Sequence, residues 1–233
     1  MDERRTVLNE EDQLRHEELS KDPDYMQNAR RPEGEAGRIM IRRMNGGAHA
    51  QLAAWGFPLL KDIPAGADIL DAGCGGGANL ARWMDFCPEC RVTGLDYSPI
   101  SIDESRRFNS EEIAAGRCSV VEGDVTRMPF GDNAFDCVSA FETIYFWPDI
   151  ERAFAEVFRV LKPGGTFFIC NESDGTDERT RNAAPLIKGL TLYDSDALQR
   201  LLTRAGFAEI NFYRLPGTFY LAVIAKKLLS SQN

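Results

Sequence analysis

The sequence of 233 residues predicts a doubly wound α/β fold, in which helices cover both faces of a mostly parallel sheet. Strand-like and helix-like patterns alternate from Ile69 onward, which is typical of parallel strands joined by crossover helices. Four glycines occupy the five positions from Gly73 to Gly77, directly after the first strand. Two strand-like segments around Pro216-Gly217 follow at the end and predict an antiparallel C-terminal strand in a sheet of seven.

The elements are expected in a regular order. Ser98 can cap a helix that begins at Pro99, and Gly206 ends the last helix. The amphipathic helix at 149–161 is stopped by the Lys-Pro-Gly-Gly segment that follows it. The expected strands are 68–73, 91–96, 118–124, 134–143, 166–172, 209–215 and 218–227, and the remaining helices are 78–86 and 194–207.

The N-terminal part of the chain has a different pattern. Apolar residues with near-helical spacing are interrupted at Gly46-Gly47, which predicts two short helices joined by a tight turn. This part holds too few apolar residues for a core of its own. We therefore expect an N-terminal helical cap segment at 1–66 and one main domain at 67–233.

Charge and composition disfavour several functions. The net charge of -9, with a pI near 4.9, argues against nucleic acid as a partner, because such a surface repels phosphate backbones. The N-terminus has no apolar stretch of the secretory kind, and no apolar run approaches the roughly 20 residues of a membrane span. We therefore expect a cytoplasmic protein with no membrane partner, and the oligomeric state is left open.

Six cysteines in a chain of this length do not suggest a disulfide scaffold. Cys87 and Cys90 form a lone CxxC pair, and no second pair of metal ligands follows at a compatible spacing. We interpret this segment as a plain loop between a helix and a strand, and no metal is expected.

The glycine turn predicts a ligand at the carboxyl edge of the sheet. Gly73, Gly75 and Gly77 lack Cβ atoms, so the turn can adopt positive φ and let a ligand lie against its backbone. Asp71 precedes the glycines, and Asp96 ends the second strand, where a carboxylate can bind the hydroxyl groups of a ribose. The segment also fits the G-x-G-x-x-G/A pattern of dinucleotide-binding proteins, and such glycines can also serve only a tight turn.

Three further features distinguish between these interpretations. Asp71 is a poor neighbour for a pyrophosphate but suits an ammonium group, and Asp124 follows the third strand, where it can bind an adenine amino group. The third feature is "RVLKPGGTFFI" at 159–169, which precedes the terminal strand pair. Together with "DILDAGCGGG" at 68–77 and "VTGLDYS" at 92–98, these motifs resemble the class I S-adenosylmethionine-dependent methyltransferases in order and spacing over residues 67–226.

This resemblance implies a Rossmann-like fold, S-adenosylmethionine as the cofactor, and a role for each matching residue. The loop of Asp71, Gly73, Gly75 and Gly77 would hold the methionine part of the cofactor. Asp96 would bind the ribose hydroxyls of the cofactor, and the backbone around Phe141 would line its sulfonium end. Tyr97 and Val125 would pack on the adenine ring, and Asp124 would bind the adenine amino group.

The segment 141–149 should face the reacting centre, because it follows the fourth strand beside the switch point of the sheet. It lacks the Asn/Asp/Ser-Pro-Pro-aromatic tetrad that amino-group methylases of nucleic acids share. Glu142 is a candidate general base, with a purely structural hydrogen bond as the alternative. Tyr145, Phe146 and Trp147 would either floor an acceptor pocket or pack under the cap.

Four further residues are candidates for the acceptor site. His49 has Leu52 and Trp55 at helical spacing, which favours packing, but it becomes a proton acceptor if the cap closes over the site. The other three candidates are Glu172 and Asp174, which can also form a solvated loop, and Tyr193.

The sequence therefore predicts a methyltransferase that moves a methyl group from S-adenosylmethionine to a small-molecule acceptor. Catalysis is assigned to Glu142, His49 and Tyr145, and a base is needed only where the acceptor carries a proton. A nicotinamide-dependent oxidoreductase shares the glycine turn, and a non-catalytic cofactor-binding protein shares the whole fold. The complete motif set favours an enzyme over the latter.

Overall fold

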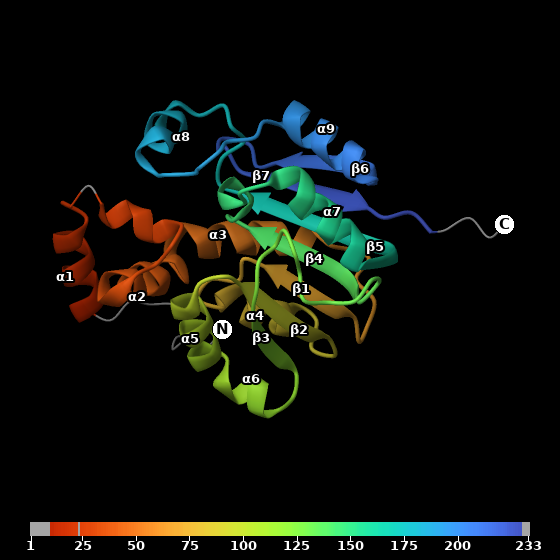
Figure 1. Ribbon diagram of the computed structural model, residues 1–233, viewed down its shortest axis with the longest axis horizontal. Coiled ribbons are helices and arrows are strands. Elements are labelled where there is room, and N and C mark those ends of the chain that lie inside the picture. Colours follow the sequence, from red (N-terminus) through yellow and green to blue (C-terminus); the bar gives the residue numbers. More distant parts are fainter. Residues whose placement is uncertain (1–9, 23, 230–233) are drawn as a thin grey trace.

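A seven-stranded sheet forms the centre of the computed structural model, which describes residues 10–22 and 24–229 (Figure 1). The strand order is β3-β2-β1-β4-β5-β7-β6, and every neighbouring pair is parallel except those that β7 makes with β5 and β6. This arrangement confirms the predicted fold class. The strands are β1 (Asp68–Ala72), β2 (Arg91–Asp96), β3 (Cys118–Glu122), β4 (Phe135–Phe141), β5 (Leu161–Asn171), β6 (Ala208–Arg214) and β7 (Leu221–Lys226).

Helices cover both faces of the sheet and give the molecule three layers (Figure 1). Neighbouring residues of β5 show the two cores: Phe167 is buried with α7 and α9, whereas Phe168 is buried with α3 and α4. Successive side chains of a strand alternate between the faces, so the apolar run of β5 serves both. The helices are α3 (Gly47–Gly56), α4 (Ala78–Phe86), α5 (Pro99–Phe108) and α6 (Ser110–Ala114) on one face, and α7 (Ile150–Val160) and α9 (Ser195–Ala205) on the other.

Local signals set the ends of these helices as expected. Ser98 precedes α5, and its Oγ accepts a hydrogen bond from the N–H of Ser101 at 3.3 Å. Asp149 caps α7 in the same way, accepting from the N–H of Arg152 at 3.1 Å. Gly206, in the left-handed region, ends α9. The strand order reverses between β1 and β4, so a ligand crevice is expected at the carboxyl ends of these two strands.

The N-terminal segment contains α1 (Glu10–Leu19), η2 (Tyr25–Ala29), α2 (Gly34–Met44), α3 and η3 (Phe57–Leu59). The break between α2 and α3 falls at the glycine pair, as predicted. Leu52 and Ala53 of α3 are buried in the core beneath the sheet, so α3 is part of a helical layer rather than of a separate cap. The term "cap helices" is used below for α1, η2 and α2, and the domain boundary at residue 66 stays a prediction.

The start of β5 and the segment that follows β5 differ from the sequence-based expectation. β5 begins at Leu161 rather than at Thr166, because Leu161 pairs with Phe135 before a register shift in the ladder. Gly164, at φ +83°, lies in this irregular stretch, and its N–H donates to the carbonyl of Lys227 at 2.7 Å. The polar segment after β5 contains α8 (Glu178–Ala183) and η5 (Ala184–Leu186), which had been expected to be a loop.

The CxxC segment was wrongly interpreted as a plain loop. Cys87 and Cys90 are joined by a disulfide, with their Cα atoms 5.4 Å apart. The turn after α4 brings them together, and the N–H of Cys90 donates to the carbonyl of Cys87 at 3.0 Å. The other four cysteines are buried and unpaired: Cys74, Cys118, Cys137 and Cys170. Among the described residues, no helix is both long and apolar enough to cross a membrane.

Candidate cofactor and acceptor site

The turn between β1 and α4 forms a glycine-lined cradle. Gly73 has φ +83°, and a Cβ atom there would lie 2.0 Å from Oγ1 of Thr143, so this glycine allows β4 to approach the turn. Gly75 has φ +51°, but a Cβ atom there would meet nothing within 4 Å. The backbone at Gly75 therefore faces open space, as a surface that receives a ligand must.

Asp71 lies buried beside this turn, with 2% of its surface exposed. Its Oδ1 accepts a hydrogen bond from Oγ of Ser139 at 2.6 Å, and Ser139 is its register partner on β4. Burial raises the pKa of Asp71 to about 7, and the nearby charge of Asp96 acts in the same direction. The carboxylate forms no ion pair within the described residues. A cationic ligand would lower the free energy of its charged form.

Asp96 connects the first two strand-to-helix turns. Its Oδ2 accepts from the N–H of Gly75 at 2.9 Å, and its Oδ1 accepts from the N–H of Ser98 at 2.9 Å. Burial raises the pKa of this carboxyl group above its ordinary value. The residue thus lies at the carboxyl end of β2, as the sequence predicted, and its carboxylate contacts the glycine turn. Ser98, not Asp96, provides the side-chain cap of α5.

The residues predicted to contact adenine lie at the ends of β2 and β3. Tyr97 is 45% exposed, and its hydroxyl donates to the carbonyl of Arg30 in the N-terminal segment at 2.6 Å. Asp124 is exposed, and its Oδ1 accepts from both the N–H and the hydroxyl of Thr126. Val125 is partly buried against the core. Their contacts with adenine stay a prediction.

Phe141 ends β4, and its side chain is buried with Phe57 and Phe168, at ring-centroid distances of 5.3 and 5.4 Å. Its backbone, rather than its ring, is therefore the part that can line the cofactor site. The neighbouring Thr143 was not predicted from the sequence. Its side chain packs against Gly73 and accepts from Nε1 of Trp147 at 3.2 Å.

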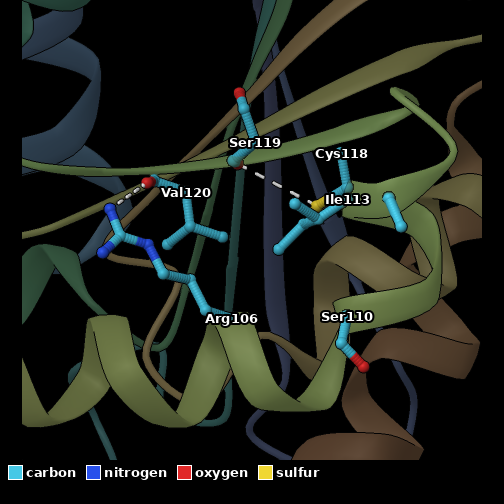
Figure 2. A pocket seen from close by; sticks show the side chains of 7 residues that line it. Arg106, Ser110, Ile113, Cys118, Ser119 and Val120 are labelled. Atoms are coloured by element: carbon cyan, nitrogen blue, oxygen red, sulfur yellow. Dashed lines mark hydrogen bonds between the residues drawn. The ribbon is translucent and has the colours of Figure 1, made fainter.

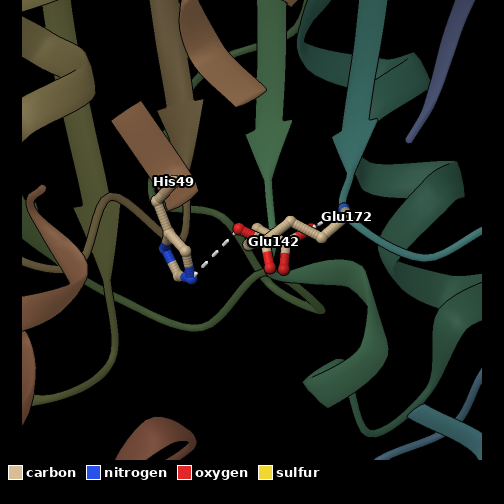
Figure 3. A group of neighbouring side chains, drawn as sticks. All are labelled: His49, Glu142 and Glu172. Atoms are coloured by element: carbon tan, nitrogen blue, oxygen red, sulfur yellow. Dashed lines mark hydrogen bonds and ion pairs between the residues drawn. The ribbon is translucent and has the colours of Figure 1, made fainter. Parts of the chain in front are cut away.

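Glu142 and Glu172 meet at the carboxyl ends of β4 and β5 (Figure 3). Oε1 of Glu142 accepts from the hydroxyl of Tyr145 at 2.7 Å and from the N–H of Glu172. Burial raises the pKa of Glu142 to about 8, and the charge of Glu172 adds to this shift. Glu142 also has φ +57°, a backbone conformation that non-glycine residues rarely adopt outside functional sites and tight turns.

His49 points from α3 toward this pair, with its Nε2 3.9 Å from Oε1 of Glu172 (Figure 3). Burial lowers the pKa of His49 to about 4, and the charges of Arg43 and Arg82 act in the same direction. The imidazole is thus neutral at pH 7. The structure brings the three catalytic candidates, His49, Glu142 and Tyr145, into one cluster, although their catalytic roles stay predictions.

Other candidates have structural partners elsewhere. The Trp147 ring is buried beside Phe154 and Phe167 beneath α7, so it packs in the core and not under the cap helices. The carboxylate of Asp174 accepts hydrogen bonds from Thr176 in its own loop and forms an ion pair with Arg214, at the end of β6, at 3.5 Å. Phe146 and Tyr193 are partly buried against the core that contains Tyr145.

Contacts between the cap helices and the glycine turn were not predicted. Nδ2 of Asn45 donates to the carbonyl of Gly76 at 3.2 Å, and Nη2 of Arg82 donates to the carbonyl of Asn45 at 2.8 Å. The side chain of Gln27 also forms hydrogen bonds with the backbone of Leu186 and Lys188, which follow α8. No sequence motif marks these contacts, because they join segments that are distant in the chain.

A separate cavity of about 460 Å³ lies beside the edge strand β3 (Figure 2). Nη2 of Arg106 donates to the carbonyl of Val120 at 2.8 Å at its wall. None of the residues predicted for the cofactor or the acceptor lines it. The lining residues are Arg106, Ser110, Ile113, Ala114, Cys118, Ser119 and Val120.

The doubly wound sheet, the glycine cradle and the two buried acids beside it are features of the class I methyltransferase fold. Residues 70–169 match the model of the family described as methyltransferase domain. The match covers less than half of the chain, and it indicates similarity to S-adenosylmethionine-dependent methyltransferases over the first five strands. The sterol 24-C-methyltransferase of Aspergillus fumigatus is 39% identical to it over 105 residues, which are 45% of this chain and 28% of that protein. The chain thus matches well under half the length of this relative.

Solved structures show the same fold. A chain of the complex between the Haloferax volcanii Trm112 methyltransferase activator and a methyltransferase superposes with a TM-score of 0.74 and 21% identity, over 88% of this chain and 100% of that chain. The geranyl diphosphate C-methyltransferase of Streptomyces coelicolor, solved with Mg²⁺, geranyl diphosphate and S-adenosylhomocysteine, gives a TM-score of 0.66 at 15% identity. This second match covers 77% of this chain and 78% of that chain.

Proposed function

We propose that the protein transfers a methyl group from S-adenosylmethionine to a small-molecule acceptor. The observation that carries this proposal is the burial of Asp71 and Asp96 on either side of an open glycine cradle. The family match and the methyltransferase activities named for its relatives support the same activity.

The charges at the cradle fit S-adenosylmethionine better than a nicotinamide dinucleotide. Its amino and sulfonium groups are cationic, and its ribose offers two hydroxyl donors. A pyrophosphate in the same place would bring negative charge next to Asp71 and Asp96, which burial already makes costly to ionise. These residues therefore support a cationic cofactor, with Asp71 near the methionine part and Asp96 at the ribose.

S-adenosylmethionine supplies an electrophilic methyl carbon: its bond to sulfur breaks as the bond to the acceptor forms, and the sulfonium becomes a neutral thioether. The protein's part is to align the acceptor in line with that bond and to exclude water. Glu142 and Tyr145 lie at the carboxyl end of β4, where the acceptor is expected. Where the acceptor carries a proton, Glu142 is the group proposed to receive it, in the ionised form that predominates above its pKa of about 8.

A small-molecule acceptor is supported by the negative net charge and by the names of the relatives, which act on sterols and on geranyl diphosphate. Nucleic acid would meet repulsion over most of this surface. The cytoplasmic location expected from the sequence stays a prediction.

Calorimetric titration of the purified protein with S-adenosylmethionine, S-adenosylhomocysteine and NADH tests the cofactor. We expect micromolar binding of the first two and none of NADH. Binding of NADH alone would refute the proposal and favour the oxidoreductase alternative.

Methyl transfer itself is tested by incubating the protein with radiolabelled S-adenosylmethionine and pooled small-molecule acceptors that include sterols and prenyl diphosphates. Label in an extractable product supports the enzyme. Cofactor binding without label in any pool would favour the non-catalytic alternative.

A further inference from the structure

Three metal-ligating side chains converge from three separate elements at the acceptor end of the sheet. His49 comes from α3, Glu142 follows β4, and Glu172 follows β5 (Figure 3). One nitrogen or oxygen from each lies within 4.8 Å of the other two. Two carboxylates and an imidazole are donors that first-row divalent cations accept, with metal–ligand distances of about 2.0–2.3 Å.

A single ion can bridge atoms at this spacing. Two ligands on opposite sides of a metal lie about 4.4 Å apart, twice the metal–ligand distance, and ligands at a right angle lie closer. Shifts of a few tenths of an ångström in the side chains would therefore bring all three atoms to bonding distance. Oε1 of Glu142 is held by Tyr145 and by the N–H of Glu172, so the site has partners that orient one of its ligands.

We propose that His49, Glu142 and Glu172 form a binding site for one first-row divalent cation such as Mn²⁺ or Zn²⁺. The donor set excludes the thiolate-rich chemistry of structural zinc sites, and the nitrogen ligand disfavours Ca²⁺ and Mg²⁺, which take oxygen. Three protein ligands leave coordination positions open to water or to an oxygen atom of the acceptor. This proposal goes beyond methyl transfer and does not depend on it.

The test uses the full chain after treatment with EDTA and removal of the chelator. MnCl₂ and ZnSO₄ are titrated separately into the wild type by calorimetry, and Co²⁺ is added to give a visible absorption spectrum. We expect one ion per chain. The variants His49→Ala and Glu172→Gln should each bind at least tenfold more weakly and change the Co²⁺ spectrum.

Matched controls separate this site from adventitious binding. His16→Ala removes the other histidine, which hydrogen-bonds Tyr25 in the N-terminal segment. Glu122→Gln removes an exposed carboxylate at the end of β3. Both controls should bind the metals like the wild type. If the controls weaken binding as much as His49→Ala and Glu172→Gln do, or if the wild type binds no Mn²⁺, Zn²⁺ or Co²⁺ at millimolar concentration, the proposal is wrong.

Glu142→Gln is less decisive, because its Oε1 also receives the hydrogen bond from Tyr145, so circular dichroism must first show that the variant folds. Titration of S-adenosylmethionine into the same samples keeps the two proposals distinct. Cofactor binding without metal binding refutes only the cation site. Metal binding without cofactor binding refutes only the proposed function.

Discussion

Oδ1 of Asp71 and Oγ of Ser139 lie 2.6 Å apart and join the end of β1 to β4 across the switch point of the sheet. Ser139 also accepts a hydrogen bond from Nε1 of Trp83 at 2.9 Å, which fixes its orientation from α4. Asp71, the acid that precedes the glycine turn, is therefore held by a buried network, and its charge changes near neutral pH.

Cofactor affinity should depend on pH through Asp71. With a pKa of about 7 in the ligand-free protein, this carboxyl group is mostly protonated at pH 6 and mostly ionised at pH 8. A cationic cofactor binds the ionised form, so affinity should rise about tenfold over that interval. Calorimetry across this pH range measures the effect, and Asp71→Asn should bind more weakly with a flatter profile. Equal pH profiles for the two proteins would contradict the assignment.

The same carboxyl group should affect stability. Its pKa is higher in the folded protein than its ordinary value of 3.8, so the folded state binds the additional proton. Its contribution to the free energy of unfolding is therefore complete below about pH 4 and is lost as the pH rises through about 7. Urea unfolding at pH 5 and pH 8 should show a decrease for the wild type that Asp71→Asn reduces. A decrease of the same size in the variant would assign it to other groups.

Asp96→Ala should weaken S-adenosylmethionine binding about 10- to 100-fold. A hydrogen bond to a charged group contributes about 1.5–3 kcal/mol, and this carboxylate also holds the N–H of Gly75. Asp62→Ala serves as the control, since Asp62 is exposed and precedes β1. Calorimetric affinities of the two variants decide the question. Near-wild-type affinity of Asp96→Ala would refute the placement of the ribose.

Gly75→Ala separates backbone strain from ligand contact. Gly75 and Gly66 have φ values of +51° and +71°, and a Cβ atom meets nothing within 4 Å at either position. Alanine at either should therefore lower the free energy of unfolding by about 1–2 kcal/mol. Only Gly75→Ala should also weaken cofactor binding, because its Cβ would occupy the space left for the ligand. Equal loss of affinity in Gly66→Ala would point to strain alone.

Glu104 joins the cap helices to the main domain. It is buried, and its carboxylate contacts Arg38 at 2.9 Å and Arg42 at 3.4 Å, both on α2. Glu104→Ala should lower the free energy of unfolding by about 3 kcal/mol, because both guanidinium groups lose a buried partner. Asp103→Ala, which removes an exposed carboxylate 3.5 Å from Arg38, should cost less than 1 kcal/mol. Urea unfolding compares them, and similar losses would contradict the assigned role.

The sequence was sufficient to predict the sheet and the positions of Asp71, the glycine turn and Asp96 at its carboxyl edge. The alternation of strand and helix patterns is visible in the sequence itself. Asp71, the glycines and Asp96 lie within about 30 residues of chain, so their positions at the strand ends can be predicted from their spacing. Glycines permit the tight turn after β1, and acids at the carboxyl ends of parallel strands lie where ligands bind, so both features can be interpreted without the tertiary structure.

The acceptor side was only partly predictable. Glu142 and Glu172 were recognised as pocket candidates, but their contact with each other and with His49 depends on how β4, β5 and α3 pack. The contact between Thr143 and Gly73 depends on the spacing of two strands. The disulfide of Cys87 and Cys90 depends on a turn whose geometry the CxxC pattern does not specify.

The position of β7 has a consequence for how the chain folds during synthesis. β7 lies between β5 and β6, although it follows both of them in sequence. When the ribosome has released residues up to Arg214, β6 has no partner in the sheet, and the free edge of β5 is exposed. The last described strand therefore completes the sheet in one step, pairing with β5 on one side and β6 on the other. A nascent chain that stalls before Leu221 presents two unpaired strand edges, which makes it a substrate for chaperones and for aggregation.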